Sequence, residues 1–325
     1  MIGKIFVWLL TTVLLTTVSF AEAQQAKVHR IGFLRTSAAP ESYLEAFRQG
    51  LKGLGYIEGK NIAFEYRWAG GKIDRLPALA AELVSLKVDI IVTDGTPPAL
   101  AARKASGTIP IVMASSGDPV GTGLIASLAR PGGNITGLTS LNAELSAKVL
   151  ELLKEIIPRL TQVANLGQAD SPVDELAMKN MEAPARALGV KLIPFRFRGP
   201  DDYEGVFRAA TKERAGALLV HGTPSTSPAD RKRIVELAAK NRLPAVYDTK
   251  DWADNGGLMS YGADRIDMYR RAATYADKIL KGAKPADLPV EQPTRFELVI
   301  NMKTAKALGI KIPNSILVQT TKVIE

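Results

Sequence analysis

Short apolar runs alternate with amphipathic segments along most of the chain. The runs, such as residues 88–92, are rich in Val, Ile and Leu and have the length of buried strands. The segments between them repeat apolar residues every three or four positions, as Leu44, Phe47 and Leu51 do, which is typical of a helix with one buried face. Gly55 follows that segment, where glycine commonly ends a helix. The alternation predicts an α/β protein with mainly parallel sheets.

The same pattern assigns an element to most of the chain. The predicted strands cover residues 30–34, 61–68, 88–92, 109–113, 135–139, 162–166, 191–195, 217–220, 243–247, 258–261 and 296–301. The predicted helices cover residues 41–54, 73–86, a segment that begins at Thr96, a short segment near Ser127, and residues 143–157, 173–188, 201–214, 229–241 and 265–280.

One sequence pattern occurs twice. Residues 88–97 read V-D-I-I-V-T-D-G-T-P and residues 216–224 read G-A-L-L-V-H-G-T-P. A second pair of apolar runs follows each, at 109–118 and at 243–251. Two βα halves of similar order predict two Rossmann-like lobes, with a ligand in the crevice where strand ends from both lobes meet.

We expect the chain to pass between the lobes three times, which would form a hinge. The helix at 265–280 would return to the first lobe, and the strand at 296–301 would belong to the second. The expected N-terminal lobe comprises residues 29–139 plus 263–290, and the expected C-terminal lobe comprises residues 140–262 plus 291–325.

The first 23 residues have the pattern of a secretory signal peptide. Lys4 precedes an apolar, threonine-rich stretch, and Ala21-Glu22-Ala23 is an A-x-A cleavage site. The alternative is a membrane anchor, but residues 5–20 fall short of the roughly twenty residues that span a bilayer. We therefore expect export, cleavage after Ala23 and a soluble mature protein.

Several kinds of chemistry are excluded by what the sequence lacks. There is no cysteine, so disulfides, thiolate catalysis, cysteine zinc sites and a lipid-modified N-terminal cysteine are ruled out. The dinucleotide, P-loop and nucleophile-elbow motifs are missing as well. With only two histidines, a histidine metal site is not expected, and no serine stands out as a nucleophile for His221. We expect no cofactor, no metal and no enzymatic activity.

The net charge of +9 does not indicate nucleic-acid binding. Aromatic residues make up only 6% of the chain, and the basic residues of its second half are scattered rather than grouped on one helix or loop. Solvated basic faces account for this charge. A basic patch that docks a membrane partner or attracts acidic solutes stays open as an alternative.

Polar residues gather at the carboxyl ends of predicted strands in both lobes. The candidate ligand-binding residues are Arg35, Thr36, Ser37, Asp94, Gly95, Thr96, Ser115, Ser116, Asp118, Asp170, His221, Thr223, Asp251, Trp252 and Tyr261. Hydroxyls and glycines at helix N-termini leave backbone N–H groups for a carboxylate, which we expect near Thr96 and Ser116. Asp170 or Asp251 would bind an ammonium group. Together they match a zwitterion such as an amino acid.

Each candidate also has a structural alternative. Tyr261 or Trp252 would line an apolar side-chain pocket, or would instead pack against the hinge. Thr96 alone is compatible with a helix N-cap. Asp118 precedes a proline and is compatible with a simple turn. His221 is compatible with a structural hydrogen bond.

These residues carry a resemblance to a known family. The stretches of the chain that match the family are R-I-G-F-L, V-D-I-I-V-T-D-G-T-P-P-A-L-A-A-R-K, I-P-I-V-M-A-S-S-G-D-P-V, L-A-R-P-G-G-N-I-T-G-L-T and F-E-L-V-I-N-M-K-T-A-K-A-L-G-I-K-I-P. In this order they resemble the solute-binding proteins of ABC transporters in the tryptophan/tyrosine-type group. The string S-L-A-R-P-G-G-N-I-T-G is the most specific of them.

The resemblance implies a type I periplasmic-binding fold and a monomeric receptor that closes on a small-molecule solute. The receptor would deliver the solute, an amino acid or related small carboxylate, to the membrane permease of an ABC transporter. Gram-positive relatives carry a lipidated cysteine that this chain lacks, so a freely diffusing periplasmic protein is implied. The matched motifs favour residues 94–96 and 115–118 over the second-lobe candidates.

Two rival functions remain. A secreted α/β enzyme acting on a small carboxylic acid would need a positioned nucleophile or base. The sensing lobe of a transcriptional regulator would share this fold, but the predicted signal peptide argues against it.

Overall fold

The structure of the protein is a computed structural model, which describes a large part of the chain. The described residues are 27–38, 40–140, 142–169, 171–220 and 227–325. The predicted signal peptide and the candidates Asp170, His221 and Thr223 lie outside them. Within the described residues, no helix is both long enough and apolar enough to cross a membrane.

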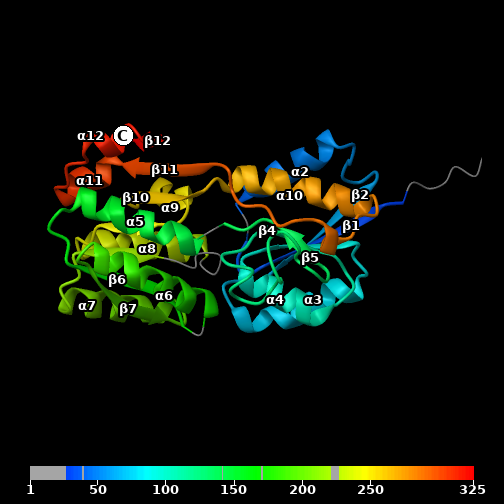
Figure 1. The fold of residues 1–325 in the computed structure, drawn as a ribbon, viewed down its shortest axis with the longest axis horizontal. Coiled ribbons are helices and arrows are strands. Elements are labelled where there is room, and N and C mark those ends of the chain that lie inside the picture. Colours follow the sequence, from blue (N-terminus) through cyan, green and yellow to red (C-terminus); the bar gives the residue numbers. More distant parts are fainter. Residues whose placement is uncertain (1–26, 39, 141, 170, 221–226) are drawn as a thin grey trace, which may run out of the picture.

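The first sheet has five parallel strands in the order β2-β1-β3-β4-β5 (Figure 1). Its strands are β1 (His29–Arg35), β2 (Ile62–Trp68), β3 (Ile90–Asp94), β4 (Ile111–Ser115) and β5 (Ile135–Gly137). Its helices are α2 (Glu41–Gly53), α3 (Leu76–Ser85, after a 3-10 turn at Ile73–Arg75), α4 (Thr96–Ala105) and α10 (Arg265–Leu280). We call this sheet and its helices the first lobe.

Both faces of the first sheet are covered. Ile90 and Val92 of β3 pack with α2 and α10 in one core, and Ile91 between them packs with α3 and α4 in another. Successive side chains of a strand point to opposite faces, so an uninterrupted apolar run fills two cores. Helix α10 therefore joins the first lobe, although it comes from late in the sequence.

The second sheet has seven strands in the order β12-β11-β10-β9-β8-β6-β7. Its strands are β6 (Gln162–Gln168), β7 (Lys191–Phe197), β8 (Ala217–Val220), β9 (Ala245–Tyr247), β10 (Met259–Ala263), β11 (Phe296–Asn301) and β12 (Lys322–Ile324). Its helices are α5 (Asn142–Ile156), α6 (Pro172–Ala187), α7 (Tyr203–Lys212, after a 3-10 turn at Pro200–Asp202), α8 (Pro228–Lys240), α9 (Lys250–Asp254), α11 (Met302–Leu308) and α12 (Asn314–Leu317). We call this assembly the second lobe.

Two cores sandwich the second sheet as well. Val163 of β6 packs with α5, α6, α11 and α12, whereas the next residue, Ala164, packs with α7, α8 and α9. All paired strands of this sheet are parallel except β10 and β11, which run antiparallel. The prediction of an α/β protein with two mainly parallel sheets is confirmed.

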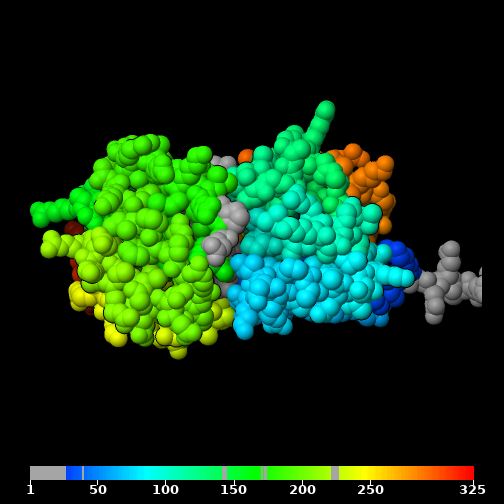
Figure 2. Space-filling view, turned by 90° about the horizontal axis from the view of Figure 1, so that it is seen from below, coloured from blue at the N-terminus to red at the C-terminus, as the bar shows by residue number. Residues whose placement is uncertain are grey.

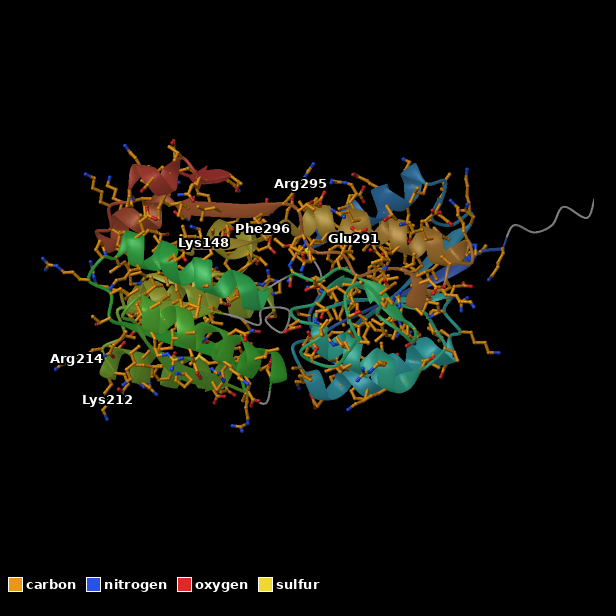
Figure 3. All side chains as sticks on the ribbon, viewed as in Figure 1. Lys148, Lys212, Arg214, Glu291, Arg295 and Phe296 are labelled. Atoms are coloured by element: carbon orange, nitrogen blue, oxygen red, sulfur yellow. The ribbon has the colours of Figure 1, made fainter. Side chains whose placement is uncertain are left out.

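The chain crosses between the sheets after β5, after β10, and after the 3-10 turn at Pro285–Asp287. On the last crossing, the Thr139 N–H of the first lobe donates to the Glu291 carbonyl at 2.9 Å, and Phe296 already begins β11 (Figure 3). The Asp264 N–H donates to the Arg295 carbonyl at 3.0 Å, so the second and third crossings lie side by side.

Several details differ from the sequence prediction, which did not include the short helices α9, α11 and α12. The helix expected near Ser127 is absent, and residues 119–129 form turns and bends. The Asp118 Oδ1 accepts the Gly121 N–H at 2.7 Å, and Gly123 lies in the left-handed region with φ of 68°, which interrupts a helix at this point. The strand β12 was not predicted, because three residues at a sheet edge carry no periodic pattern.

Candidate functional site

The carboxyl ends of strands from the two sheets face one another. Tyr43, in the first turn of the helix after β1, donates its hydroxyl hydrogen to Asp251 Oδ2 after β9 at 2.7 Å. A Cβ placed on Gly121 of the first lobe would meet the Leu176 side chain of the second. In the space-filling view the two lobes meet along a seam (Figure 2). The strand ends that parallel α/β sheets use for ligands therefore lie at this interface.

A buried cluster of charges centres on Asp94, the last residue of β3. Its carboxylate lies 2.9 Å from Arg35 Nη2 and 3.0 Å from Arg265 Nη1, and it accepts the Tyr269 hydroxyl at 2.8 Å. Asp94 is 1% exposed. Burial alone would raise the pKa of Asp94, but the two guanidinium groups outweigh it and the pKa lies below its usual value. Asp94 is therefore ionised and fully occupied by its partners.

Arg35, the last residue of β1, keeps part of its hydrogen-bonding capacity free. Its side chain is 5% exposed, and its Nε and Nη1 have no hydrogen-bond partner in the described part of the chain. The neighbouring Thr36 hydroxyl is also buried and has no partner among the described residues. A buried donor left unpaired costs about 1–3 kcal/mol. In the cluster of Arg35, Arg265 and Asp94, two positive charges face one negative charge, so an anionic group is the partner that fits.

Thr96 and Ser116 lie together at the ends of β3 and β4. Their hydroxyl oxygens are 3.1 Å apart, and both side chains are buried. The N-cap of α4 is Gly95, with φ of 94°, and Thr96 is the first helical residue. Thr96 is thus not an N-cap, and the structure leaves its hydroxyl paired with Ser116. Only glycine adopts the Gly95 conformation readily.

The other candidates of the first lobe have structural surroundings. Ser37 and Ser115 are buried at the ends of β1 and β4. Asp118 closes the turn described above, as the simpler interpretation held, and its backbone carbonyl accepts the Thr122 hydroxyl at 2.6 Å.

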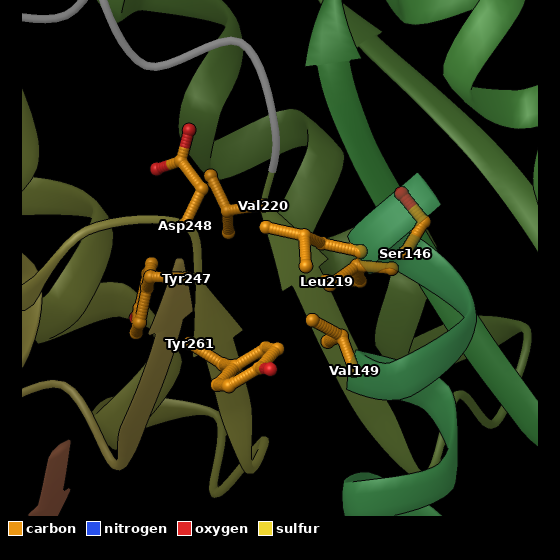
Figure 4. A pocket seen from close by; sticks show the side chains of 8 residues that line it. Ser146, Val149, Leu219, Val220, Tyr247, Asp248 and Tyr261 are labelled. Carbon is orange, nitrogen blue, oxygen red and sulfur yellow. The ribbon is translucent and has the colours of Figure 1, made fainter. Parts of the chain in front are cut away.

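A small pocket lies at the carboxyl edge of the second sheet (Figure 4). Its empty space amounts to ≈ 280 Å³ including the mouth. The lining residues come from α5, β8, β9 and β10 and are Leu145, Ser146, Val149, Leu219, Val220, Tyr247, Asp248 and Tyr261. Most of this wall is apolar, with Asp248 as its one carboxylate. In this arrangement of the lobes its interior has only ≈ 10 Å³ open to a water-sized group, room for about one water molecule, so the wall would have to open for a larger apolar group to enter.

Tyr261 and Trp252 have different places in this wall. The Tyr261 ring lines the pocket and also stacks at 6.2 Å on Phe296, next to the third crossing. The Trp252 ring is 0% exposed and stacks at 4.6 Å on Tyr247 from the core side. Trp252 therefore supports the pocket from behind, while Tyr261 faces it.

The last described candidate, Asp251, is engaged on both sides. Its Oδ2 accepts the Tyr43 hydroxyl and lies 3.3 Å from Arg231 Nη1 on α8.

In the described chain, no group of three or more His, Asp or Glu residues is arranged to hold a metal ion.

The comparisons with known proteins fit this geometry. The chain matches the family described as ABC transporter substrate binding protein over residues 36–324. The chain belongs to this family. A conserved domain protein from Vibrio cholerae has a solved structure that superposes with a TM-score of 0.85 at 28% identity, over 91% of this chain and 100% of that one.

Two relatives of the family are named with a ligand. The ABC domain of Streptococcus pneumoniae, solved in complex with L-Trp, is 25% identical with a TM-score of 0.84, over 92% of this chain and 100% of that one. The tyrosine-binding protein of Clostridioides difficile (strain R20291) is 27% identical over 269 residues, 82% of this chain and 76% of that protein.

As a family member, the chain is a substrate-binding protein of an ABC transporter. Proteins of this family in general have the transporter's permease as their partner. The family comprises solute-binding receptors rather than enzymes. Substrate-binding proteins of ABC importers act in the periplasm or outside the cell. Nothing in the comparisons supports the alternative of a secreted enzyme.

Several residues of the site were missed by sequence reasoning. Arg265 and Tyr269 on α10 complete the Asp94 cluster, and Tyr43 reaches across from α2. Arg265 could have been found, because it follows the carboxyl end of β10 as the other candidates follow their strands. The apolar lining from α5 carries no comparable signal, since Leu145 and Val149 look like ordinary core positions.

Proposed function

We propose that the protein is a periplasmic receptor for an amino acid with an apolar or aromatic side chain. The solute would lie between the lobes, with one end at the Arg35 cluster and the other in the pocket lined by Tyr261. The observation that carries the proposal is the buried Arg35 guanidinium, whose Nε and Nη1 lack a partner among the described residues. The names of the tryptophan-bound and tyrosine-binding relatives support the same class.

The carboxylate of the solute would pair with Arg35. A carboxylate supplies the missing negative charge and would accept an N–H bond from Nε or Nη1, which donate from different edges of the guanidinium group because Nη2 between them is paired with Asp94. Thr36, beside Arg35, offers a further hydroxyl. Thr96 and Ser116, at the neighbouring strand ends, remain proposed contacts of the same carboxylate.

The ammonium and the side chain of the solute would occupy the second lobe. Asp248 lies on the pocket wall, and its negative charge is close enough to raise the pKa of Arg265 across the interface. A solute ammonium placed between Asp248 and the pocket would bring its side chain against Val149, Leu219 and Tyr261. Hydrogen bonds and ion pairs would thus fix the backbone of the amino acid, and apolar contact would select its side chain.

Binding from both lobes implies a hinge. We propose that residues 29–139 with 263–290 move against residues 140–262 with 291–325 about the three crossings. A solute that contacts both lobes stabilises their closed arrangement. We further propose export by the N-terminal 23 residues with cleavage after Ala23, a monomeric mature protein, and delivery of the solute to a dedicated permease.

Calorimetry with matched solutes tests the carboxylate contact. We expect the purified protein to bind L-tyrosine or L-tryptophan, and to bind tyramine or tryptamine at least about a hundredfold more weakly. Two hydrogen bonds to a charged group are each worth about 1.5–3 kcal/mol, and about 1.4 kcal/mol is tenfold in affinity. Arg35→Met should reduce amino-acid binding to the level of the amine.

Arg30→Met is the control, because Arg30 lies on the same strand with a side chain that is 45% exposed. It should leave both affinities unchanged. Equal binding of the amine and the amino acid would contradict the Arg35 contact. Failure of every amino acid to bind would remove this class of solute.

A further inference from the structure

A hydrogen bond between two side chains connects the lobes at their interface. Tyr43 belongs to α2 of the first lobe, and its hydroxyl donates to Asp251 Oδ2 on α9 of the second lobe at 2.7 Å. Tyr43 is 3% exposed, so its hydroxyl is shielded from water where the lobes meet. If the lobes separate, this bond is replaced by bonds to water.

Both partners are held in place before they meet. The Tyr43 ring packs 5.3 Å from the ring of Tyr269, whose hydroxyl is tied to Asp94. On the other side, Arg231 Nη1 lies 3.3 Å from the same Asp251 oxygen and is buried. Because little side-chain freedom is left to lose, the bond contributes most of its strength to closure.

We propose that Tyr43 and Asp251 form a latch that stabilises the closed arrangement of the lobes without touching the solute. The proposal rests on the hinged receptor proposed above. In it, Tyr43 is a positioning residue, since it acts on the solute only through the open–closed equilibrium. The ring contact with Tyr269 places the latch one residue away from Asp94 and its partner Arg35.

The latch predicts a specific kinetic effect. A hydrogen bond to a charged group changes an equilibrium by about tenfold to about a hundredfold. Tyr43→Phe removes only the hydroxyl, so solute should dissociate at least about tenfold faster while its association rate constant stays within about twofold. Stopped-flow measurement with L-tryptophan or L-tyrosine follows both rates.

The chain offers a matched control in Tyr56. The Tyr56 hydroxyl donates to Asp277 Oδ1 at 3.1 Å, the same kind of bond, but both residues belong to the first lobe. Tyr56→Phe should leave both rate constants unchanged. Equal rates in the Tyr43→Phe and Tyr56→Phe variants would overturn the latch.

A double-mutant cycle separates the latch from a contact with the solute. Asp251→Ala should reproduce the rates of Tyr43→Phe, and the double variant should be no faster than either single variant. Asp251→Asn keeps an oxygen acceptor and should retain part of the effect. Additive losses would show that Asp251 acts on the solute directly, and the latch would fail.

A measurement on solute-free protein tests the latch independently of the proposed class of solute. The chain has no cysteine, so spin labels can be attached at Lys104→Cys and Lys212→Cys, two exposed positions on different lobes. In solute-free protein, Tyr43→Phe should shift the distance distribution between the labels toward longer distances. No shift would refute the latch, whereas a shift without any amino-acid binding would keep the latch and remove the proposed solute.

Discussion

Asp94 should be the most sensitive position of the first lobe. Its carboxylate is 1% exposed and neutralises Arg35 and Arg265, which are buried with it. Asp94→Asn keeps the size of the side chain and removes its charge, so two guanidinium groups remain buried without an anion. Breaking a buried ion pair on one side costs about 3–5 kcal/mol. We expect a loss of this size in the free energy of unfolding of the first lobe.

Thermal and urea denaturation measure this loss. For a lobe of this size, about 3–5 kcal/mol corresponds to a melting temperature lower by roughly 6–20 °C. Glu204→Gln is the control, because Glu204 pairs with Arg233 at 3.6 Å on the surface and is 54% exposed. It should change stability by less than about 1 kcal/mol. An Asp94→Asn variant as stable as this control would refute the role assigned to the cluster.

The pH dependence of the cluster has a defined sign. The pKa of Asp94 in the folded protein lies below the ordinary value of 3.8. The ionised Asp94 carboxylate therefore stabilises the folded protein fully at pH values above the pKa that Asp94 has in the unfolded chain. This stabilisation is lost as the pH falls through the lower pKa that Asp94 has in the folded protein. The difference in stability between wild type and Asp94→Asn should be constant near neutral pH and shrink below about pH 4.

Two further predictions follow from neighbouring sites. Thr96→Val leaves the Ser116 hydroxyl, 3.1 Å away, without its partner, and should weaken solute binding about tenfold without unfolding the protein; calorimetry with unchanged affinity would remove Thr96 from the site. Burial raises the pKa of Asp174 to about 6, so the native state holds its proton more tightly than the unfolded state. The free energy of unfolding should then fall by about 2 kcal/mol between pH 4 and pH 7 because of this group. Asp174→Asn should remove that fall in urea titrations, and an equal fall in both proteins would contradict the assignment.

Much of the fold could be predicted because it follows local patterns. The run at 88–92 predicted a strand, and in the structure Ile91 and Val92 of β3 pack into different cores on its two faces. The direction of a strand within its sheet was harder to predict from the sequence. The segment Phe296–Asn301 reads as a strand, but its antiparallel pairing with β10 depends on how the third crossing returns.

The candidate site was predictable only in part, because its contacts are distant in sequence. Asp94 was singled out by its place after a strand, whereas its partner Arg265 lies 171 residues further along. Trp252 has the composition of a pocket residue, but stacking on Tyr247 places it in the core. Local patterns locate strand ends, and tertiary packing decides which of their side chains keep a free donor.

A crystal structure of the protein with L-tyrosine or L-tryptophan tests the central claim most directly. The account predicts electron density for the amino acid between the lobes, with its carboxylate on Arg35 and its side chain in the pocket beside Tyr261. Density that contacts one lobe only, or that lies away from Arg35, would contradict it.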